Sequence, residues 1–199
     1  MNPAREPHGG CQRPQPEALV KLHVGGLEVS LVDTETLLSL ARTWAATVTV
    51  VTARRRPSAI TPEAPEVDGF TATAFMMLSL EPPLLALGVA RDSGADDLVE
   101  DADHVAVNLL SEGQAELSHA FARTHRDRGD AWERFPWTLD AHGTPLLSGT
   151  TGAFSARILE RQGRGDHLLV VAEVTAVHPG DNARTLVYQN RAYARLTPL

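Results

Sequence analysis

The chain has 199 residues, of which 43% are hydrophobic and 22% charged, close to the globular average, and this length predicts one domain or at most two small ones. A single cysteine, Cys11, excludes a disulfide-stapled fold and a multi-cysteine zinc site, and the net charge of −7 argues against binding to nucleic acid or to an anionic membrane. No apolar stretch of about 18 residues and no signal-peptide core is present, so we expect a cytoplasmic protein.

The N-terminal part divides into a tail and a short hairpin. Residues 1–17 are rich in proline and glycine, which predicts a disordered tail. Residues 18–199 are then expected to form one domain. Between Leu19 and Val32, apolar residues alternate loosely around Gly25 and Gly26, a pattern that predicts a β-hairpin.

A helix, a strand and a loop follow. Asp33 or Thr34 is placed to cap a helix whose apolar residues recur at helical spacing up to Trp44. Residues 47–52 are β-branched throughout, which predicts a buried strand. Residues 53–67 carry three prolines and three consecutive arginines, so we expect an irregular loop whose arginines either are solvated or meet a phosphate.

Short strands dominate the remainder. Strands are predicted at 70–75, 84–90, 104–110, 153–161 and 167–178, with a final strand pair, or a strand and a turn, within 184–196. Amphipathic helices are predicted at 96–103 and 112–123, and an aromatic-rich loop at 132–137. Many strands with few short helices predict a mainly β fold, a barrel with helical decorations. No glycine motif of a dinucleotide site or a P-loop is present.

Two segments carry candidate ligand-binding groups. Small and hydroxyl residues between Asp68 and Phe75 would let a flat ligand lie close to the backbone, whose N–H and C=O groups can read a heteroaromatic edge. The alternative is an ordinary buried strand. Further on, Gly165-Asp166-His167 leads into a strand, where His167 could bind a substrate or shuttle a proton, or where the segment is only a turn.

The acidic residues and the histidines show no metal-binding pattern. The acids within 96–103 lack the spacing of a calcium loop and are typical of a solvated helix face. His119 and His125 are six residues apart, which suits no helical metal pair. We therefore expect no metal site.

Taken in chain order from about Leu37 to Leu196, several segments resemble the short-chain flavin reductase family. Any one of them is a weak match, and their joint order carries the resemblance. The family patterns and the matching segments are F-x-T-G-V-T-V-V-T at Trp44–Thr52, T-A-N-S-F at Thr71–Phe75, S-L-x-P-P-L at Ser79–Leu84, F-A-V-N-V-L at Val105–Leu110, E-L-S-x-x-F-A at Glu116–Ala122, P-L-L at Pro145–Leu147, G-D-H at Gly165–His167 and P-L-V-Y…G-x-Y at Leu186–Tyr193.

The resemblance implies an FMN-binding split β-barrel of Greek-key type. Members of this family bind FMN or FAD and reduce it with NADH or NADPH, and many release the reduced flavin to a separate flavin-dependent monooxygenase. They are usually homodimers with the flavin near the subunit interface. These properties are our expectations for this chain.

The resemblance also implies a set of site residues. His167 is expected where the nicotinamide stacks on the flavin, and because hydride transfer needs no general base, its role there is to position the reactants. Tyr193 is expected to contact the substrate beside His167. The expected flavin contacts are Phe70, Thr71, Ala72, Thr73, Ala74, Phe75, Ser79, Leu80, Ala90, Arg91, Ser93 and Phe121.

The chain departs from the family pattern at the flavin phosphate. Family members carry an S-S-R-T-H-like run after the strand at 84–90, whereas this chain reads Asp92-Ser93-Gly94-Ala95-Asp96-Asp97. An arginine and a threonine are thus missing, and two carboxylates are added. The leading hypothesis is an NAD(P)H:flavin oxidoreductase, and the alternative is a repurposed barrel that binds or transforms another small molecule, as in specialised biosynthesis.

Overall fold

The computed structural model describes residues 21–24, 27–30, 32–56, 66–91, 93–123, 130–182 and 184–197. Two compact units are distinguished, the first ending at Ala41 and the second running from Arg42 to Leu199. The tail predicted at 1–17 lies outside the described residues. The assignment of residues 18–199 to one domain stays a prediction.

The first unit contains the predicted hairpin and helix. Strand β1 (Lys21–Val24) pairs antiparallel with β2 (Leu27–Ser30), and the turn glycines between them lie outside the described residues. Helix α1 (Thr34–Arg42) begins as expected, because the carboxylate of Asp33 accepts a hydrogen bond from the backbone N–H of Thr36 at 2.7 Å. A hydrogen bond with the side chain of Thr36, together with that from its backbone N–H, lowers the pKa of Asp33.

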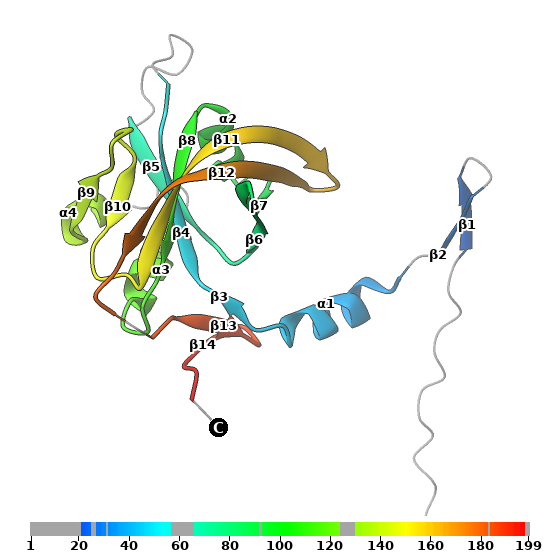
Figure 1. The fold of residues 1–199 in the computed structure, drawn as a ribbon. Coiled ribbons are helices and arrows are strands. Elements are labelled where there is room, and N and C mark those ends of the chain that lie inside the picture. Colours follow the sequence, from blue (N-terminus) through cyan, green and yellow to red (C-terminus); the bar gives the residue numbers. More distant parts are fainter. Residues whose placement is uncertain are drawn as a thin grey trace, which may run out of the picture. The chain divides into compact units, whose positions relative to one another are not determined.

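The second unit is built on a seven-stranded antiparallel sheet that curls into a split β-barrel (Figure 1). Its strands lie in the order β5-β4-β8-β11-β12-β7-β6, so several neighbours are distant in sequence, as in the predicted Greek key. The strands are β4 (Thr49–Arg54), β5 (Val67–Ala72), β6 (Phe75–Leu80), β7 (Pro83–Ala90), β8 (His104–Leu109), β11 (Gly152–Arg164) and β12 (His167–Pro179).

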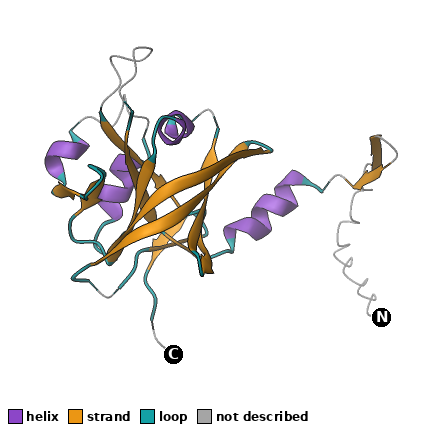
Figure 2. Ribbon diagram, turned by 45° about the horizontal axis from the view of Figure 1, so that its top comes forward, coloured by secondary structure: helices purple, strands orange, loops and turns teal. Residues whose placement is uncertain are grey.

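Short elements complete this unit (Figure 2). A three-stranded sheet is formed by β3 (Ala46–Thr47), β13 (Val187–Gln189) and β14 (Ala192–Ala194), and a two-stranded sheet by β9 (Trp137–Leu139) and β10 (Pro145–Leu147). The helices are α2 (Ala95–Glu100), α3 (Ala115–Phe121) and α4 (Ala131–Arg134). No helix in the described part of the chain is long and apolar enough to cross a membrane.

Two local predictions were wrong. The strand predicted at 70–75 ends at Ala72, and the chain turns there because the carbonyl of Ala74 accepts the backbone N–H of Gly88 at 2.8 Å, which starts β6 along β7. The loop predicted at 132–137 begins with α4 instead. Aromatic packing orders it, since the ring of Trp132 meets that of Phe121 with centroids 5.0 Å apart.

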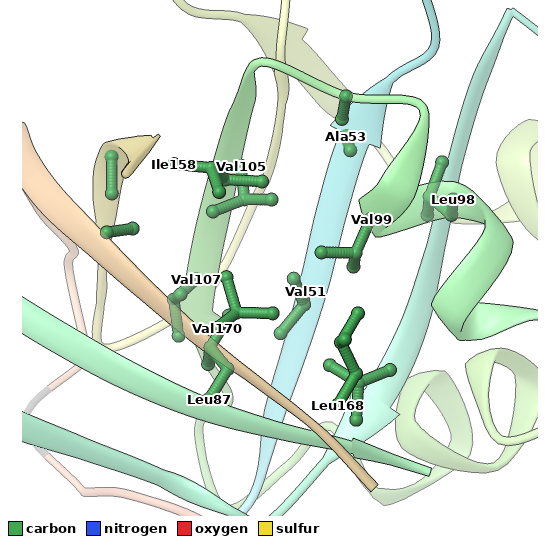
Figure 3. Packing of buried hydrophobic residues seen from close by; sticks show 14 of the residues in the cluster. Val51, Ala53, Leu87, Leu98, Val99, Val105, Val107, Ile158, Leu168 and Val170 are labelled. Carbon is green, nitrogen blue, oxygen red and sulfur yellow. The ribbon is translucent and has the colours of Figure 1, made fainter. Parts of the chain in front are cut away.

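The β-branched strand β4 is buried on both faces, which explains its composition. Toward the barrel interior, Val51 packs with Leu87, Val107 and Val170 from three other strands (Figure 3). On its other face, residues of β4 join a second cluster with Leu117, Phe121 and Leu147. The barrel core therefore packs on one face of β4, and helix α3 packs on the other face.

A buried polar side chain links three strands around β4. The amide of Asn108, fully buried on β8, donates to the carbonyl of Val50 and to the hydroxyl of Thr52, both at 3.1 Å. Its oxygen accepts the backbone N–H of Leu147 on β10 at 2.9 Å. The Thr52 hydroxyl in turn donates to the carbonyl of Pro145 at 2.5 Å. These bonds satisfy polar groups that have no access to water.

The turn between β9 and β10 is tied to the barrel by a carboxylate and a pair of histidines. Asp140 accepts hydrogen bonds from the Ser155 hydroxyl at 2.6 Å and from the backbone N–H of Thr144 at 2.8 Å. Burial opposes ionisation of Asp140, but its hydrogen bonds outweigh that effect and lower its pKa. The His142 ring stacks on that of His104 with centroids 4.0 Å apart.

This histidine pair should make stability depend on pH. Burial, with the nearby charge of His142, lowers the pKa of His104. The folded chain therefore binds fewer protons than the unfolded chain, and the free energy of unfolding falls as the pH drops below the unfolded value of about 6.5. We expect the loss of stability between neutral and mildly acidic pH, measured by urea unfolding, to be smaller in His104→Asn than in the wild type. Equal losses in the two proteins would contradict this account.

Candidate functional site

A cavity of about 370 Å³ opens beside β5 and β7, between residues of α2 and α3. Its volume falls within the range of roughly 300–1,000 Å³ that is typical of small-molecule sites. The structure brings most of the predicted site residues together in its walls, namely Phe70, Thr71, Ala72, Thr73, Ala74, Ala90, Ser93, Phe121 and His167.

One wall of the cavity is the chain from Asp68 to Ala74, where small side chains leave the backbone accessible. The hydroxyl of Thr71 donates to the carbonyl of Ser118 on α3 at 2.7 Å, which fixes this wall to the helix. Because the Thr71 hydrogen is used in this bond, the hydroxyl oxygen is left to accept from a ligand.

Gly88 on β7 also lines the cavity and lies directly against this wall. A Cβ at this position would lie 3.1 Å from the Cβ of Ala74 and 3.8 Å from Cδ2 of His167. Residue 88 must therefore be small, because Ala74 packs directly against it. A flat group can approach the backbone there more closely than any other residue would allow.

His167 stands at the start of β12, opposite Ala90 in the strand register, as the sequence predicted. Its Nδ1 lies 2.7 Å from a carboxylate oxygen of Asp166, and that contact lowers the pKa of the Asp166 carboxyl. A carboxylate at Nδ1 orients the imidazole and directs Nε2 away from it. The side chain of His167 is 45% exposed, so a ligand can reach it.

The α2 side of the cavity carries little charge. The Ser93 hydroxyl donates to the carbonyl of Ala90 at 2.7 Å, and Gly94 turns the chain into α2 with a φ of 75°, in the left-handed region. Gly94 and Ala95 line the cavity, whereas the acidic residues Asp96 and Asp97 are not among its lining residues.

Other predicted contacts lie outside this cavity. Phe75 packs on Phe154 within the barrel, and the Tyr193 hydroxyl donates to Oγ of Ser118 at 2.9 Å, behind the wall. The side chain of Arg91 lies over Gly163 on the β11–β12 hairpin. Ser79 and Leu80 lie at the end of β6, where Leu80 is 85% exposed. Their roles toward a cofactor or substrate stay predictions.

Asp68, Gly88 and Arg123 are among the lining residues that the sequence analysis did not assign to the site. Asp68 is only 3% exposed and accepts the backbone N–H of Gly69 at 2.8 Å, and its place at the head of the small-residue segment was a usable signal. Arg123 directly follows the E-L-S-x-x-F-A segment, which was a second signal. Gly88 had none, because its role depends on contacts with segments distant in sequence.

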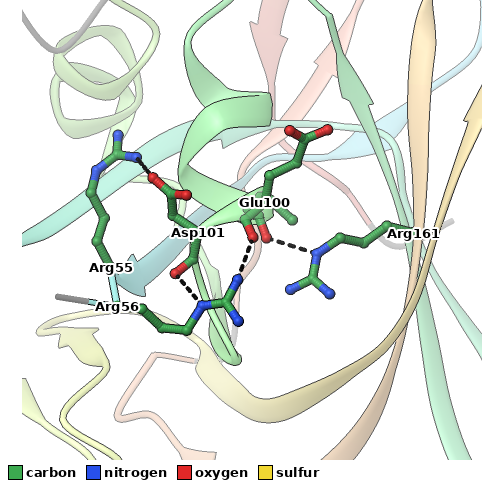
Figure 4. Close-up of polar contacts among 6 residues, drawn as sticks. Arg55, Arg56, Glu100, Asp101 and Arg161 are labelled. Atoms are coloured by element: carbon green, nitrogen blue, oxygen red, sulfur yellow. Dashed lines mark hydrogen bonds and ion pairs between the residues drawn. The ribbon is translucent and has the colours of Figure 1, made fainter. Parts of the chain in front are cut away.

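Arginines anchor the far end of α2 (Figure 4). Arg161 donates to the carbonyls of Val99, at 3.0 Å, and Ala102, while Arg56 donates to the carbonyl of Glu100 at 3.1 Å. Positive charge at a helix C-terminus complements the helix dipole. The arginine run was expected either to be solvated or to meet a phosphate. Instead, Arg55 pairs with Asp101 at 3.2 Å, Arg56 binds the end of α2, and neither residue lines the cavity.

The fold is a split β-barrel, and its cavity has the size of a small-molecule site. The cavity is lined by residues with small side chains and by a histidine at the start of β12. The family model described as "Flavin reductase like domain" matches residues 41–197. The chain therefore belongs to the flavin reductase-like family, which confirms the resemblance found in its motifs.

Individual relatives agree with this assignment. An NADH:FMN oxidoreductase of Rhodococcus erythropolis is 36% identical over 135 residues, 66% of this chain and 69% of that protein. The reductase component of flavin-dependent trigonelline monooxygenase from Acinetobacter baylyi is 33% identical over 106 residues, 53% of this chain and 33% of that protein. Among solved structures, the NADH:FAD oxidoreductase SgcE6 of Streptomyces globisporus C-1027 has a TM-score of 0.72 and 26% identity, covering 85% of this chain and 98% of that chain.

Proposed function

We propose that the protein is an NAD(P)H:flavin oxidoreductase that reduces FMN or FAD. The observation that carries this proposal is the cavity itself, which is walled by the small residues of the segment Thr71–Ala74 and by Gly88 and has His167 at its rim. The similarity to an NADH:FMN and an NADH:FAD oxidoreductase supports it.

The residues around the cavity fit a flavin. A flat ring needs close approach to backbone, and Ala72, Ala74 and Gly88 supply a wall without bulky side chains. A ribityl chain carries hydroxyl groups, for which Asp68 and Ser93 offer acceptors. When bound, the flavin supplies the electron-accepting ring that takes a hydride from a reduced nicotinamide.

The chain's own groups then act by positioning. Asp166 orients the ring of His167 through Nδ1, and His167 at the rim would hold the nicotinamide in the orientation that hydride transfer needs. No acid or base is required in that step. The apolar residues Leu98 and Phe121 exclude water from the inner end of the cavity.

The test is oxidation of NADH and of NADPH by purified protein with FMN, FAD or riboflavin added in turn. We expect flavin-dependent oxidation with at least one nucleotide. If no flavin supports turnover and none binds at micromolar concentration, the repurposed-barrel alternative replaces this proposal. No contact in the described residues favours that alternative at present.

We further propose that reduced flavin leaves the protein for a separate flavin-dependent monooxygenase. The similarity to the reductase component of a trigonelline monooxygenase supports such a partner. The cavity supports it as well, since it is open to solvent along Ala90, Ser93 and Ala122, and a diffusing flavin must enter and leave. Cytoplasmic localisation stays a prediction.

A homodimer is also proposed. The edge strand β6 exposes Met76, Met77 and Leu78, at 56%, 38% and 49%, next to an unpaired strand edge. Such an edge is a site for association with another chain. Sedimentation of the wild type is expected to give twice the monomer mass, and Leu78→Glu is expected to shift it toward the monomer. A monomeric wild type would contradict the proposal.

A further inference from the structure

We propose that Arg123 binds the phosphate of the flavin in place of the residues that the family keeps after β7. The inference rests on the proposed function. It concerns an end of the ligand that the chemistry of hydride transfer does not involve, so it can be tested separately.

The cavity holds few charged groups. Among the lining residues of the described chain, the ionisable side chains are those of Asp68, Arg123 and His167. His167 already faces the Asp166 carboxylate at 2.7 Å, and Asp68 is negative when ionised. Arg123 is therefore the one guanidinium that lines the cavity within the described residues.

Four other arginines do not line the cavity. The guanidinium of Arg91 lies over Gly163, since a Cβ there would come within 2.7 Å of it. Arg55, Arg56 and Arg161 bind the carboxyl-terminal end of α2, away from the residues of α2 that line the cavity. None of these four side chains is among the lining residues.

The α2 side is poorly suited to an anion. Gly94 and Ala95 offer no side-chain cation, and the next two residues, Asp96 and Asp97, are acidic. A phosphate dianion is repelled by carboxylates and attracted by a guanidinium, to which it can bind through two oxygens. These charges favour the α3 side, where Arg123 stands.

Packing and a hydrogen bond fix the end of α3, where Arg123 lies. Its neighbour Phe121 is 1% exposed and packs against Trp132, which fixes the end of α3 at the cavity wall. The cap of α3, Ala122, donates its backbone N–H to the carbonyl of Ser118 at 3.0 Å. The side chain of Arg123 is itself exposed, so a ligand that enters from solvent can reach it.

Comparing FMN with riboflavin, which lacks the phosphate, isolates this contact. We expect wild-type protein to bind FMN more tightly than riboflavin in fluorescence titrations. Arg123→Gln is expected to weaken FMN binding by about 10- to 100-fold and to leave riboflavin binding within about twofold. Arg123→Lys should keep part of the FMN preference. The wild-type FMN affinity, but not that of Arg123→Gln, should fall as salt is raised.

Controls separate this inference from others. Arg164→Gln, at the exposed hairpin tip, is expected to change neither affinity. Equal losses for FMN and riboflavin in Arg123→Gln, or a selective loss of FMN in Arg91→Gln alone, would overturn the role of Arg123 while leaving flavin reduction intact. A wild-type protein that binds neither flavin would overturn the proposed function and this inference together.

Discussion

Gly88→Val is expected to weaken flavin binding by at least about 100-fold, or about 2.7 kcal/mol, while the protein stays folded. The added side chain would begin 3.1 Å from Ala74, which already packs against residue 88, so its methyl groups would extend into the cavity. A flat ring cannot share that space with two methyl groups. Fluorescence titration with FMN measures the affinity, and circular dichroism verifies the fold.

Gly113→Val is the matched control for this substitution. A Cβ at Gly113 would meet nothing within 4 Å, and the residue does not line the cavity. We expect it to bind FMN like the wild type. If Gly88→Val also binds FMN normally, the ring does not lie beside β7, and the proposed site is wrong.

Asn108→Ala is expected to lower the free energy of unfolding by about 3 kcal/mol. The substitution removes two donated hydrogen bonds and one accepted bond buried between the main sheet and β10, and the N–H of Leu147 and the hydroxyl of Thr52 lose a partner. A buried polar group without its partner costs about 1–3 kcal/mol, and the missing side chain also leaves a small cavity. Urea unfolding measures the change.

Asn182→Ala tests whether burial is the reason for the large loss of stability expected in Asn108→Ala. The Asn182 side chain also donates a hydrogen bond, to the carbonyl of Gly149 at 2.8 Å, but at an exposed site. Water can replace it there, so we expect a loss of about 1 kcal/mol or less. Similar losses in the free energy of unfolding in both variants would show that burial does not increase the contribution of the Asn108 hydrogen bonds to stability.

The sequence predicted the elements whose pattern is local. The β-branched run of β4, the long hairpin of β11 and β12 and the cap at Asp33 were all found, since composition or spacing decides them. Strand β6 was missed as a separate element. Its exposed methionines break the alternation of a half-buried strand, and its start is set by a bond between Ala74 and Gly88.

The sequence also predicted only some of the residues that line the cavity. The wall from Thr71 to Ala74 is one segment and was found from its small residues, and His167 was found from its turn. Gly88 and Arg123 reach the cavity only through strand pairing and through the packing of α3, which periodicity does not reveal. The Tyr193 hydroxyl donates to Oγ of Ser118, and its expected contact with a substrate stays a prediction.

A crystal structure of the protein soaked with FMN tests the central claim most directly. The account predicts the flavin ring in the cavity, against the wall that the segment Thr71–Ala74 and Gly88 form, with the ring of His167 at its edge. It also predicts the phosphate on the side of Arg123. Flavin bound elsewhere on the barrel, or a cavity that stays free of flavin at saturating FMN, would contradict it.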